Sequence, residues 1–354
     1  MRLRRLGSLL IVVFFVLSAC AVARADAALL LEEPFGDFGA MNPTGHAAVY
    51  LNHVCADSPT HLRLCRPGEV GVVISRYKDI DGYDWLAIPL IPYLYAVDNP
   101  EDIPSSATPR LERRLRELYR VEHLESIIPD DPKTEIPRGN WIELIGASYD
   151  RRIWGFEVDT TRRQDEAFIR RFNRRRNVSH FNLFFNNCAN FSQKVLNFYY
   201  PRAVHRNFIA DAGMMTPHQA AKSLVHYSRR HPRTDLRTFV IPQVPGTIPR
   251  SRPVDGVVES VVKSKKYVVP LAVLDPWVAG SLVAVWIGDG RFHPDPEAQV
   301  YNPLVDWEPC EPDLAREARP GRASSSKPDQ VASSITAESP ASARAVSPAV
   351  ANER

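Results

Sequence analysis

The sequence has little net charge, few cysteines and no internal repeat. Its 44 lysines and arginines nearly balance its 41 aspartates and glutamates, so the formal net charge is only +3. A charge this small gives no argument for a nucleic-acid partner. The 354 residues, 44% of them hydrophobic, can fill the core of one large domain or two modest ones. The composition therefore predicts a folded protein that does not bind nucleic acid.

Long hydrophobic runs are also scarce, and the first of them lies at the N-terminus. Three arginines within residues 2–5 precede an apolar run at 9–17, which is typical of an export signal. The sequence Leu17-Ser18-Ala19-Cys20 resembles a bacterial lipobox. We therefore expect residues 1–20 to be a lipoprotein-type signal peptide and Cys20 to be lipidated. The alternative is ordinary cleavage after Ala25. Both predict an exported, periplasmic protein, and lipidation would anchor it to a membrane, the outer membrane being favoured.

The second apolar run covers residues 267–290. It contains two prolines and Asp275, and three lysines at 263, 265 and 266 precede it. A central aspartate costs about 2.5–3.5 kcal/mol in a membrane span. A buried or membrane-dipping hairpin is therefore favoured over a transmembrane helix, although both stay open.

Two of the five cysteines lie close together at positions 55 and 65. In an oxidising compartment we expect a disulfide between Cys55 and Cys65. Together with His53 and His61 they could instead form a tetrahedral metal shell. Because the spacing matches no familiar zinc signature, the disulfide is favoured, and we expect neither a metal nor a cofactor.

The predicted organisation is α+β. Strands are expected over 45–51, 69–77, 85–90 and 181–185, with a hairpin over 141–145 and 153–158; helices are expected over 110–128, after Thr160 or Thr161, from 188 and from 216. The expected segments are a tether at 21–33, a catalytic domain at 34–240, a proline-rich linker at 241–266 and a disordered tail at 312–354.

Cys188 stands where an aromatic run ends and a helical pattern begins. Unpaired backbone N–H groups and the helix dipole favour negative charge there, so this thiol should be unusually thiolate-like and nucleophilic. Phe191, Val195 and Phe198 continue the same helix face. The thiol should therefore face the sheet.

A thiol nucleophile needs a base and oxyanion donors. His46, entered through a glycine at a strand start, is the candidate base, and the backbone N–H of Cys188 with the Asn187 amide could hold the oxyanion. The group that orients the imidazole stays open among three residues on or before the next strand: Glu69, the first choice, Ser75 and His61. The competing interpretation is a buried, unreactive cysteine and a histidine with a structural hydrogen bond.

Two short motifs carry a family resemblance. Gly45-His46-Ala47-Ala48 followed by Asn186-Asn187-Cys188-Ala189 resembles the circularly permuted papain-like (NlpC-type) superfamily, in which the histidine strand precedes the cysteine helix. Within it, roughly residues 30–230 are most similar to the Lnb-type N-terminal periplasmic domain family. The related lecithin:retinol acyltransferase group has a similar asparagine-cysteine box, but this sequence lacks that group's histidine on the second strand. It also lacks the several membrane spans of multi-pass Lnb proteins.

The resemblance implies an antiparallel sheet packed on the cysteine helix and thiol-mediated acyl transfer through a Cys188 thioester. Lnb-type proteins are associated with N-acylation of lipoproteins from phospholipid, so phospholipid or lipoprotein substrates at a membrane surface are expected. Arginines 170–176 could hold the site against an anionic surface, or form a solvated helix face. One alternative is a periplasmic cysteine endopeptidase or amidase acting on peptidoglycan peptides. The other is a non-catalytic envelope protein that keeps the fold.

Overall fold

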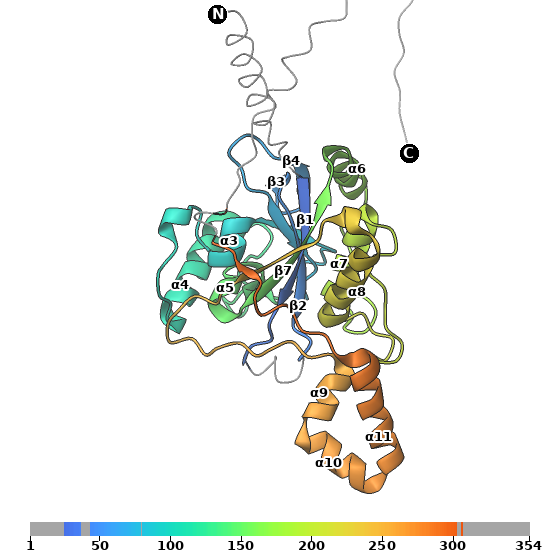
Figure 1. The fold of residues 1–354 in the computed structure, drawn as a ribbon. Helices are drawn as coiled ribbons and strands as arrows, with labels where there is room; N and C mark the ends of the chain where they lie inside the picture. The colour runs from blue at the N-terminus through green and yellow to red at the C-terminus, as the bar shows by residue number, and fades with distance from the viewer. Residues whose placement is uncertain (1–24, 37–42, 79, 303–305, 307–354) are drawn as a thin grey trace, which may run out of the picture. The chain divides into compact units, whose positions relative to one another are not determined.

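The computed structural model describes residues 25–36, 43–78, 80–302 and 306 and has a mixed α+β fold (Figure 1). The strands are β1 (Ala25–Glu32), β2 (His46–Leu51), β3 (Val54–Ser58), β4 (His61–Leu64), β5 (Val72–Ser75), β6 (Leu86–Pro89), β7 (Ile153–Thr160), β8 (Arg237–Ile241) and β9 (Gln299–Val300). The helices are α3 (Leu90–Tyr95), α4 (Pro109–Tyr119), α5 (Ala147–Asp150), α6 (Arg162–Asn173), α7 (Cys188–Tyr199), α8 (Pro217–Arg230), α9 (Val257–Lys263), α10 (Lys265–Leu274) and α11 (Pro276–Val285). Shorter helical turns are η1 (Pro100–Asp102), η2 (Arg120–Leu124), η3 (Trp141–Leu144), η4 (Pro232–Thr234) and η5 (Trp286–Gly290).

Seven strands form one sheet in the order β6-β5-β2-β1-β7-β8-β9. Every neighbouring pair is antiparallel except β8–β9, which is parallel. β3 and β4 form a separate hairpin. The predicted α+β class with an antiparallel sheet is therefore confirmed at that level.

The central strand β1 corrects the predicted tether at 21–33. Residues 25–32 are buried along their whole length and pair with β2 on one side and β7 on the other. A strand covered on both faces has a continuous apolar sequence instead of an alternating one. This run, which follows the predicted export signal, lacks the period of two that marks a half-exposed strand.

Helices cover both faces of the sheet. Ala27, Leu29 and Leu31 of β1 join the core beneath α6, α7 and α8, whereas Ala28 and Leu30 join the core beneath α3 and α5. This division follows from the alternation of side chains along a strand. Figure 1 shows the two helix layers on opposite sides of the sheet.

Most predicted elements are present, but two strand assignments are wrong. The stretch expected as the first half of a hairpin, 141–145, instead forms the helical turn η3 and leads through Gly146 into α5. The stretch 181–185 is a turn in which the side chain of Asn182 accepts hydrogen bonds from the backbone of Phe184 (2.9 Å) and Phe185 (3.1 Å). An asparagine that bonds the backbone two residues on competes with a strand.

The predicted linker at 241–266 is part of the folded unit. Ile241 closes β8, and the backbone N–H groups of Val244, Thr247 and Asp255 donate to Ser148, Ala107 and Pro43. Proline fixes the extended backbone, and the remaining N–H groups find partners on the body of the protein. The segment then becomes α9.

The apolar segment 267–290 forms a helical hairpin of α10 and α11 followed by η5. Within the described ranges, no helix combines the length and hydrophobicity needed to cross a membrane. The segment is a hairpin as expected, but its side chains are largely exposed, so the buried form of that expectation is wrong. The predictions for residues 1–20, Cys20 and 312–354 fall outside the described residues.

Candidate active site

Cys188 is the first residue of α7, as its position in the sequence predicted. Asn187 caps the helix through a reciprocal pair of bonds with Asn190, at 2.9 and 3.2 Å. The thiol is 8% exposed and belongs to the core cluster between α7 and the sheet. Among the described cysteines it is the free one. The first N–H groups of the helix have no partner within the helix and point out of its N-terminus, where Cys188 lies.

Asn187 does not supply an oxyanion donor from its side chain, contrary to one half of its predicted role. Its amide nitrogen donates to the backbone oxygens of Leu183 (2.7 Å) and Met215 (3.0 Å). Both amide hydrogens are thereby used. Asn187 is a positioning residue that joins the loop before α7 to the loop at Met215 beside Cys188, which agrees with the other half of the prediction.

His46 opens β2 opposite Glu32 of β1 and is buried. Gly45 before it has a φ of +74°, and a Cβ there would meet the Glu32 carbonyl oxygen at 2.0 Å. Only glycine fits this close approach. The imidazole stacks on Tyr77 with ring centroids 5.5 Å apart.

Ser75 determines which ring nitrogen of His46 carries the hydrogen. Its hydroxyl lies 3.1 Å from Nε2 and 2.7 Å from the carbonyl oxygen of Ala47. A hydroxyl has one hydrogen, and the carbonyl can only accept it. The Nε2–H group of His46 therefore donates to Ser75, which leaves Nδ1 for the cleft. Of the three candidates for the orienting group, Ser75 is the one in place.

Cys188 and His46 interact directly. Burial alone would lower the pKa of His46, but the negative charge and hydrogen bonding of Cys188, with the carboxylates of Glu32 and Glu143, raise that pKa to about 9. A raised imidazole pKa beside a thiol is what a thiolate–imidazolium pair requires. His46 therefore meets the requirement on the imidazole side of such a pair.

Glu143 is a site residue that the sequence analysis missed. Its Oε2 lies 3.6 Å from Nδ1 of His46, and its Oε1 lies 3.7 Å from Arg151. Arg151 also pairs with the fully buried Glu32 at 3.1 Å, and Tyr93 donates to Glu32. A buried network of alternating charge thus lies beneath the imidazole. Position 143 was assigned to a strand, so nothing in the sequence placed it near position 46.

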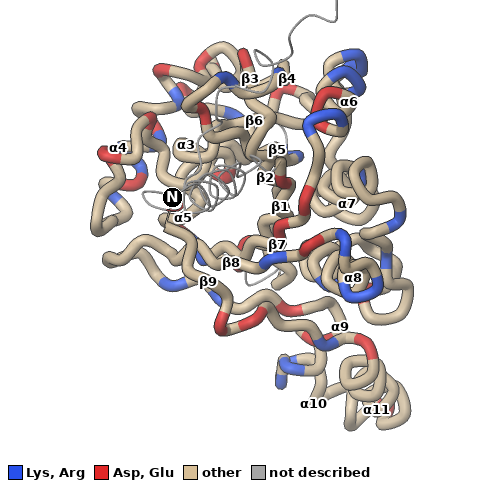
Figure 2. The backbone as a smooth tube through the Cα atoms, turned by 45° about the horizontal axis from the view of Figure 1, so that its top comes forward, with Lys and Arg blue, Asp and Glu red and all other residues tan. Residues whose placement is uncertain are grey.

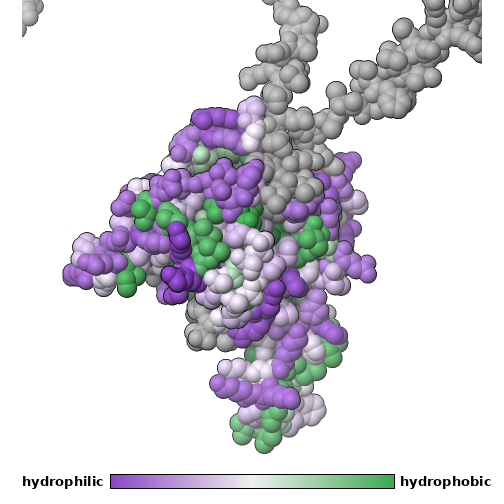
Figure 3. Space-filling model, turned by 90° about the vertical axis from the view of Figure 1, so that its left-hand side faces the viewer, coloured by the Kyte–Doolittle hydropathy of each residue, from purple (hydrophilic) through white to green (hydrophobic). Residues whose placement is uncertain are grey.

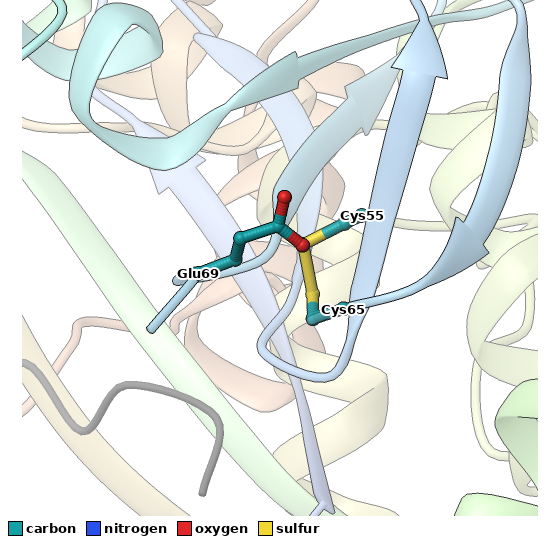
Figure 4. Close-up of side chains that lie close together, drawn as sticks. All are labelled: Cys55, Cys65 and Glu69. Carbon is teal, nitrogen blue, oxygen red and sulfur yellow. A yellow bond between two sulfur atoms is a disulfide. The ribbon is translucent and has the colours of Figure 1, made fainter. Parts of the chain in front are cut away.

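Glu69 and His61 do not orient the imidazole. Glu69 is bound by Arg63 at 2.6 Å and lies beside the disulfide between Cys55 and Cys65, as Figure 4 shows. His61 is exposed and faces Asp57 at 3.7 Å. Both side chains belong to the β3–β4 hairpin and the turn after it, whereas His46 lies at the far end of β2. The prediction for Glu69 is wrong because the chain turns before β5 and directs that carboxylate to Arg63.

The disulfide is confirmed at Cys55 and Cys65, which removes both thiolates from the alternative metal shell. Across the described chain, the residues close enough to share one ion are this pair with Glu69 and an exposed group of Asp98, Glu122 and His123. Neither group contacts the thiol.

Arg76 is a second residue that was missed. It is buried, pairs with Asp84, and reaches Asn186 and the carbonyl of Asn187 at 3.4 Å. Its guanidinium also lies over the ring of Phe191, 5.6 Å from the centroid. Arg76 follows directly on Ser75, so it fastens the strand that orients His46 to the loop that presents Cys188.

A cleft of about 800 Å³ opens over the pair. Apolar side chains make up much of its wall, including Phe35, Ile142, Phe184, Met214 and Met215, and polar groups gather at the thiol. Val257 and Ser260 of α9 line it as well. A mostly apolar cleft with a few convergent polar groups is typical of a ligand site.

Comparisons of the chain with protein-family models, with curated proteins and with solved structures found no match.

Proposed function

We propose that this chain is a cysteine-dependent acyltransferase or hydrolase of the bacterial cell envelope, with a circularly permuted papain-like fold of the NlpC type. The observation that carries the proposal is the pairing of Cys188, at the start of α7, with a buried His46 whose pKa is raised to about 9. The order of histidine strand before cysteine helix and the antiparallel sheet between them support the fold assignment and its Lnb-like subtype.

The first half-reaction follows from the groups present. The Cys188 thiolate attacks the carbonyl carbon of an ester or amide, and the backbone N–H groups at the start of α7 stabilise the oxyanion. His46 gives its proton to the leaving oxygen or nitrogen as the old bond breaks. The product is a thioester at Cys188 and a free alcohol or amine.

In the second half-reaction an amine or water enters. His46, now neutral, takes the proton of the incoming nucleophile as it attacks the thioester carbon. The carbon–sulfur bond breaks, and the thiolate–imidazolium pair is restored. Water gives hydrolysis and an amine gives acyl transfer.

A lipid substrate is supported by the apolar wall of the cleft, whose Phe184 and Met214 suit an acyl chain better than a charged peptide. Phospholipid or lipoprotein at a membrane surface is therefore the proposed partner. Export and lipidation at Cys20 would bring the site to such a surface.

Intact-protein mass after incubation with phospholipid tests the proposal. The wild-type chain should gain the mass of one acyl chain, removable by neutral hydroxylamine, and Cys188→Ala and His46→Gln should not. Glu69→Gln is the matched control and should behave as wild type. If no acyl mass appears but purified peptidoglycan releases peptides in a Cys188-dependent way, the amidase alternative replaces the lipid one. If neither occurs, the chain is non-catalytic.

A further inference from the structure

The hairpin of α10 and α11 presents a large apolar surface that the described chain does not cover. No residue of α10 is buried, and in α11 only Ala279 is. Leu274 and Trp277 beside the turn are 83% and 87% exposed, and Val273 is 77% exposed. Figure 3 shows hydrophobic side chains gathered at this end of the molecule. Exposed apolar surface of this extent marks a contact with something else.

The composition of the hairpin indicates lipid and not a protein groove. Within residues 267–288 the one charged side chain is Asp275. A helix that docks on a protein has one apolar stripe and a polar back, whereas a helix that is apolar all round belongs in a core or in a membrane. Figure 2 shows both helices nearly free of charge, with lysine at the start of α10.

The charged and aromatic residues are arranged as for an interface. Lys265 and Lys266 are exposed at the base of α10, and Tyr267 and Trp286 lie at the same end of the two helices. Lysines at this level attract anionic headgroups, and amphipathic aromatic rings favour the headgroup region. The ten residues of α10 extend about 15 Å at 1.5 Å per residue. That length suits insertion into one leaflet.

Asp275 at the tip is compatible with insertion into one leaflet. Its carboxylate accepts hydrogen bonds from the backbone of Trp277 (3.2 Å) and Val278 (3.1 Å) at the start of α11. The helix dipole favours negative charge there. The negative charge of Asp275 is thereby partly compensated within the turn. The remaining free-energy cost of burying that charge limits how deeply the hairpin inserts.

The base of the hairpin is fixed to the rim of the cleft. The N–H of Val258 in α9 donates to Ala210 at 3.2 Å, and Lys222 of α8 holds Asp289 at 2.8 Å. The loop containing Ala210 also exposes Phe208 (78%) and Ile209 (68%). Because α9 itself lines the cleft, the hairpin and the cleft opening lie at the same end of the sheet as His46.

We propose that the α10–α11 hairpin inserts into one leaflet of an anionic phospholipid bilayer, with its base at the headgroup level, and holds the mouth of the cleft against that surface. The insertion does not use the nucleophile, so it stands apart from the proposed chemistry. The arginine-rich helix α6 lies at the opposite end of the sheet in Figure 1. The membrane contact is therefore assigned to the hairpin and not to arginines 170–176.

Quenching of tryptophan fluorescence by brominated acyl chains tests the insertion. The full chain in the Cys188→Ala background is mixed with vesicles of phosphatidylethanolamine and phosphatidylglycerol, so that failure of the chemistry leaves the result unaffected. The signal of Trp277 is taken as the difference from Trp277→Phe. We expect strong quenching that is lost in Leu274→Asp, with about ten-fold weaker insertion. Replacing Lys265 by glutamine should weaken it roughly five-fold, and only on anionic vesicles.

The matched control is Leu118→Asp, which places the same charge at an exposed leucine of α4 and should quench as the parent does. Two results would overturn the proposal. One is a Trp277 that brominated lipid does not quench. The other is a concentration-dependent dimer in lipid-free solution that already shields Trp277 from iodide, which would assign the surface to a second copy of the chain.

Discussion

The hydroxyl of Ser75 lies 3.1 Å from Nε2 of His46 and donates its one hydrogen to the carbonyl oxygen of Ala47. The Nε2–H group of the imidazole thus donates to a neutral acceptor on the strand next to its own. The carboxylate of Glu143 approaches the other nitrogen. Orientation and charge are supplied to the two nitrogens by different residues, and each can be removed separately.

Removing the Ser75 hydroxyl should slow the alkylation of the Cys188 thiol. In Ser75→Ala the buried Nε2–H loses its acceptor, which costs about 1–3 kcal/mol and frees the ring to turn. We expect about ten-fold slower alkylation of Cys188 by iodoacetamide at neutral pH and a shifted rate–pH profile. Ser75→Thr keeps the hydroxyl and should restore the rate. Ser192→Ala removes another fully buried serine hydroxyl, one without a partner, and should change nothing.

Cys188→Ala should lower the pKa of His46. Burial acts to lower that pKa, and the thiolate of Cys188 is the first of the charges that raise it to about 9. The pKa measured by nitrogen-15 NMR of the ring should therefore fall in the variant. Because the folded-state pKa exceeds the unfolded value of about 6.5, the stability from charged His46 is complete below pH 6.5. It is lost as pH rises to about 9. A denaturant series over that range should show wild type losing more stability than the variant.

Glu143→Gln should lower the same pKa by less, since Glu32 and Cys188 act more strongly on His46. The change keeps the shape of the side chain and removes its charge. In a plot of the Cys188 alkylation rate against pH, the descending limb is the fall in rate at high pH that follows loss of the His46 proton. In the variant this limb should move to lower pH. Glu69→Gln makes the same chemical change at a carboxylate bound to Arg63 and should leave the limb where it is. A limb that moves equally in both variants would remove Glu143 from the site.

Breaking the disulfide should destabilise the protein without affecting the thiol. Cys55 and Cys65 are ten positions apart, and closing such a loop is worth about 2–3 kcal/mol in the chain-entropy model. The double variant Cys55→Ala/Cys65→Ala should lose about that much free energy of unfolding in urea. Its Cys188 alkylation rate should match wild type, because the disulfide lies on the separate β3–β4 hairpin. A large change in that rate would show that the hairpin supports the site.

The sequence indicated Cys188 and His46 as the candidate nucleophile and base because each stands at a boundary with a local signal. Gly45 marks the entry to β2, and Asn187 marks the cap of α7. Such signals depend on neighbours in the chain. Glu143 reaches His46, and Arg151 reaches Glu143, only through tertiary packing. The pattern of 141–145 gave no signal from which to infer this contact.

The wrong strand at 181–185 has a different cause. An aromatic run has high strand propensity, but propensity cannot distinguish a buried strand from an exposed loop with the same residues. The side chain of Asn182 decides the outcome by bonding the backbone of the next residues. Phe184 and Phe185 are consequently 52% and 68% exposed, and Phe184 lines the cleft.

The place of β1 in the middle of the sheet bears on when the protein can fold. Its eight residues come first among the described strands, yet they pair with 46–51 on one edge and with 153–160 on the other. Neither half of the sheet can join the other until residue 160 is available, and contacts between such distant positions form slowly. A chain that must wait in this way stays unfolded during synthesis of its first half. On the proposed export route, that delay would leave the chain open for threading before the thiol and imidazole meet.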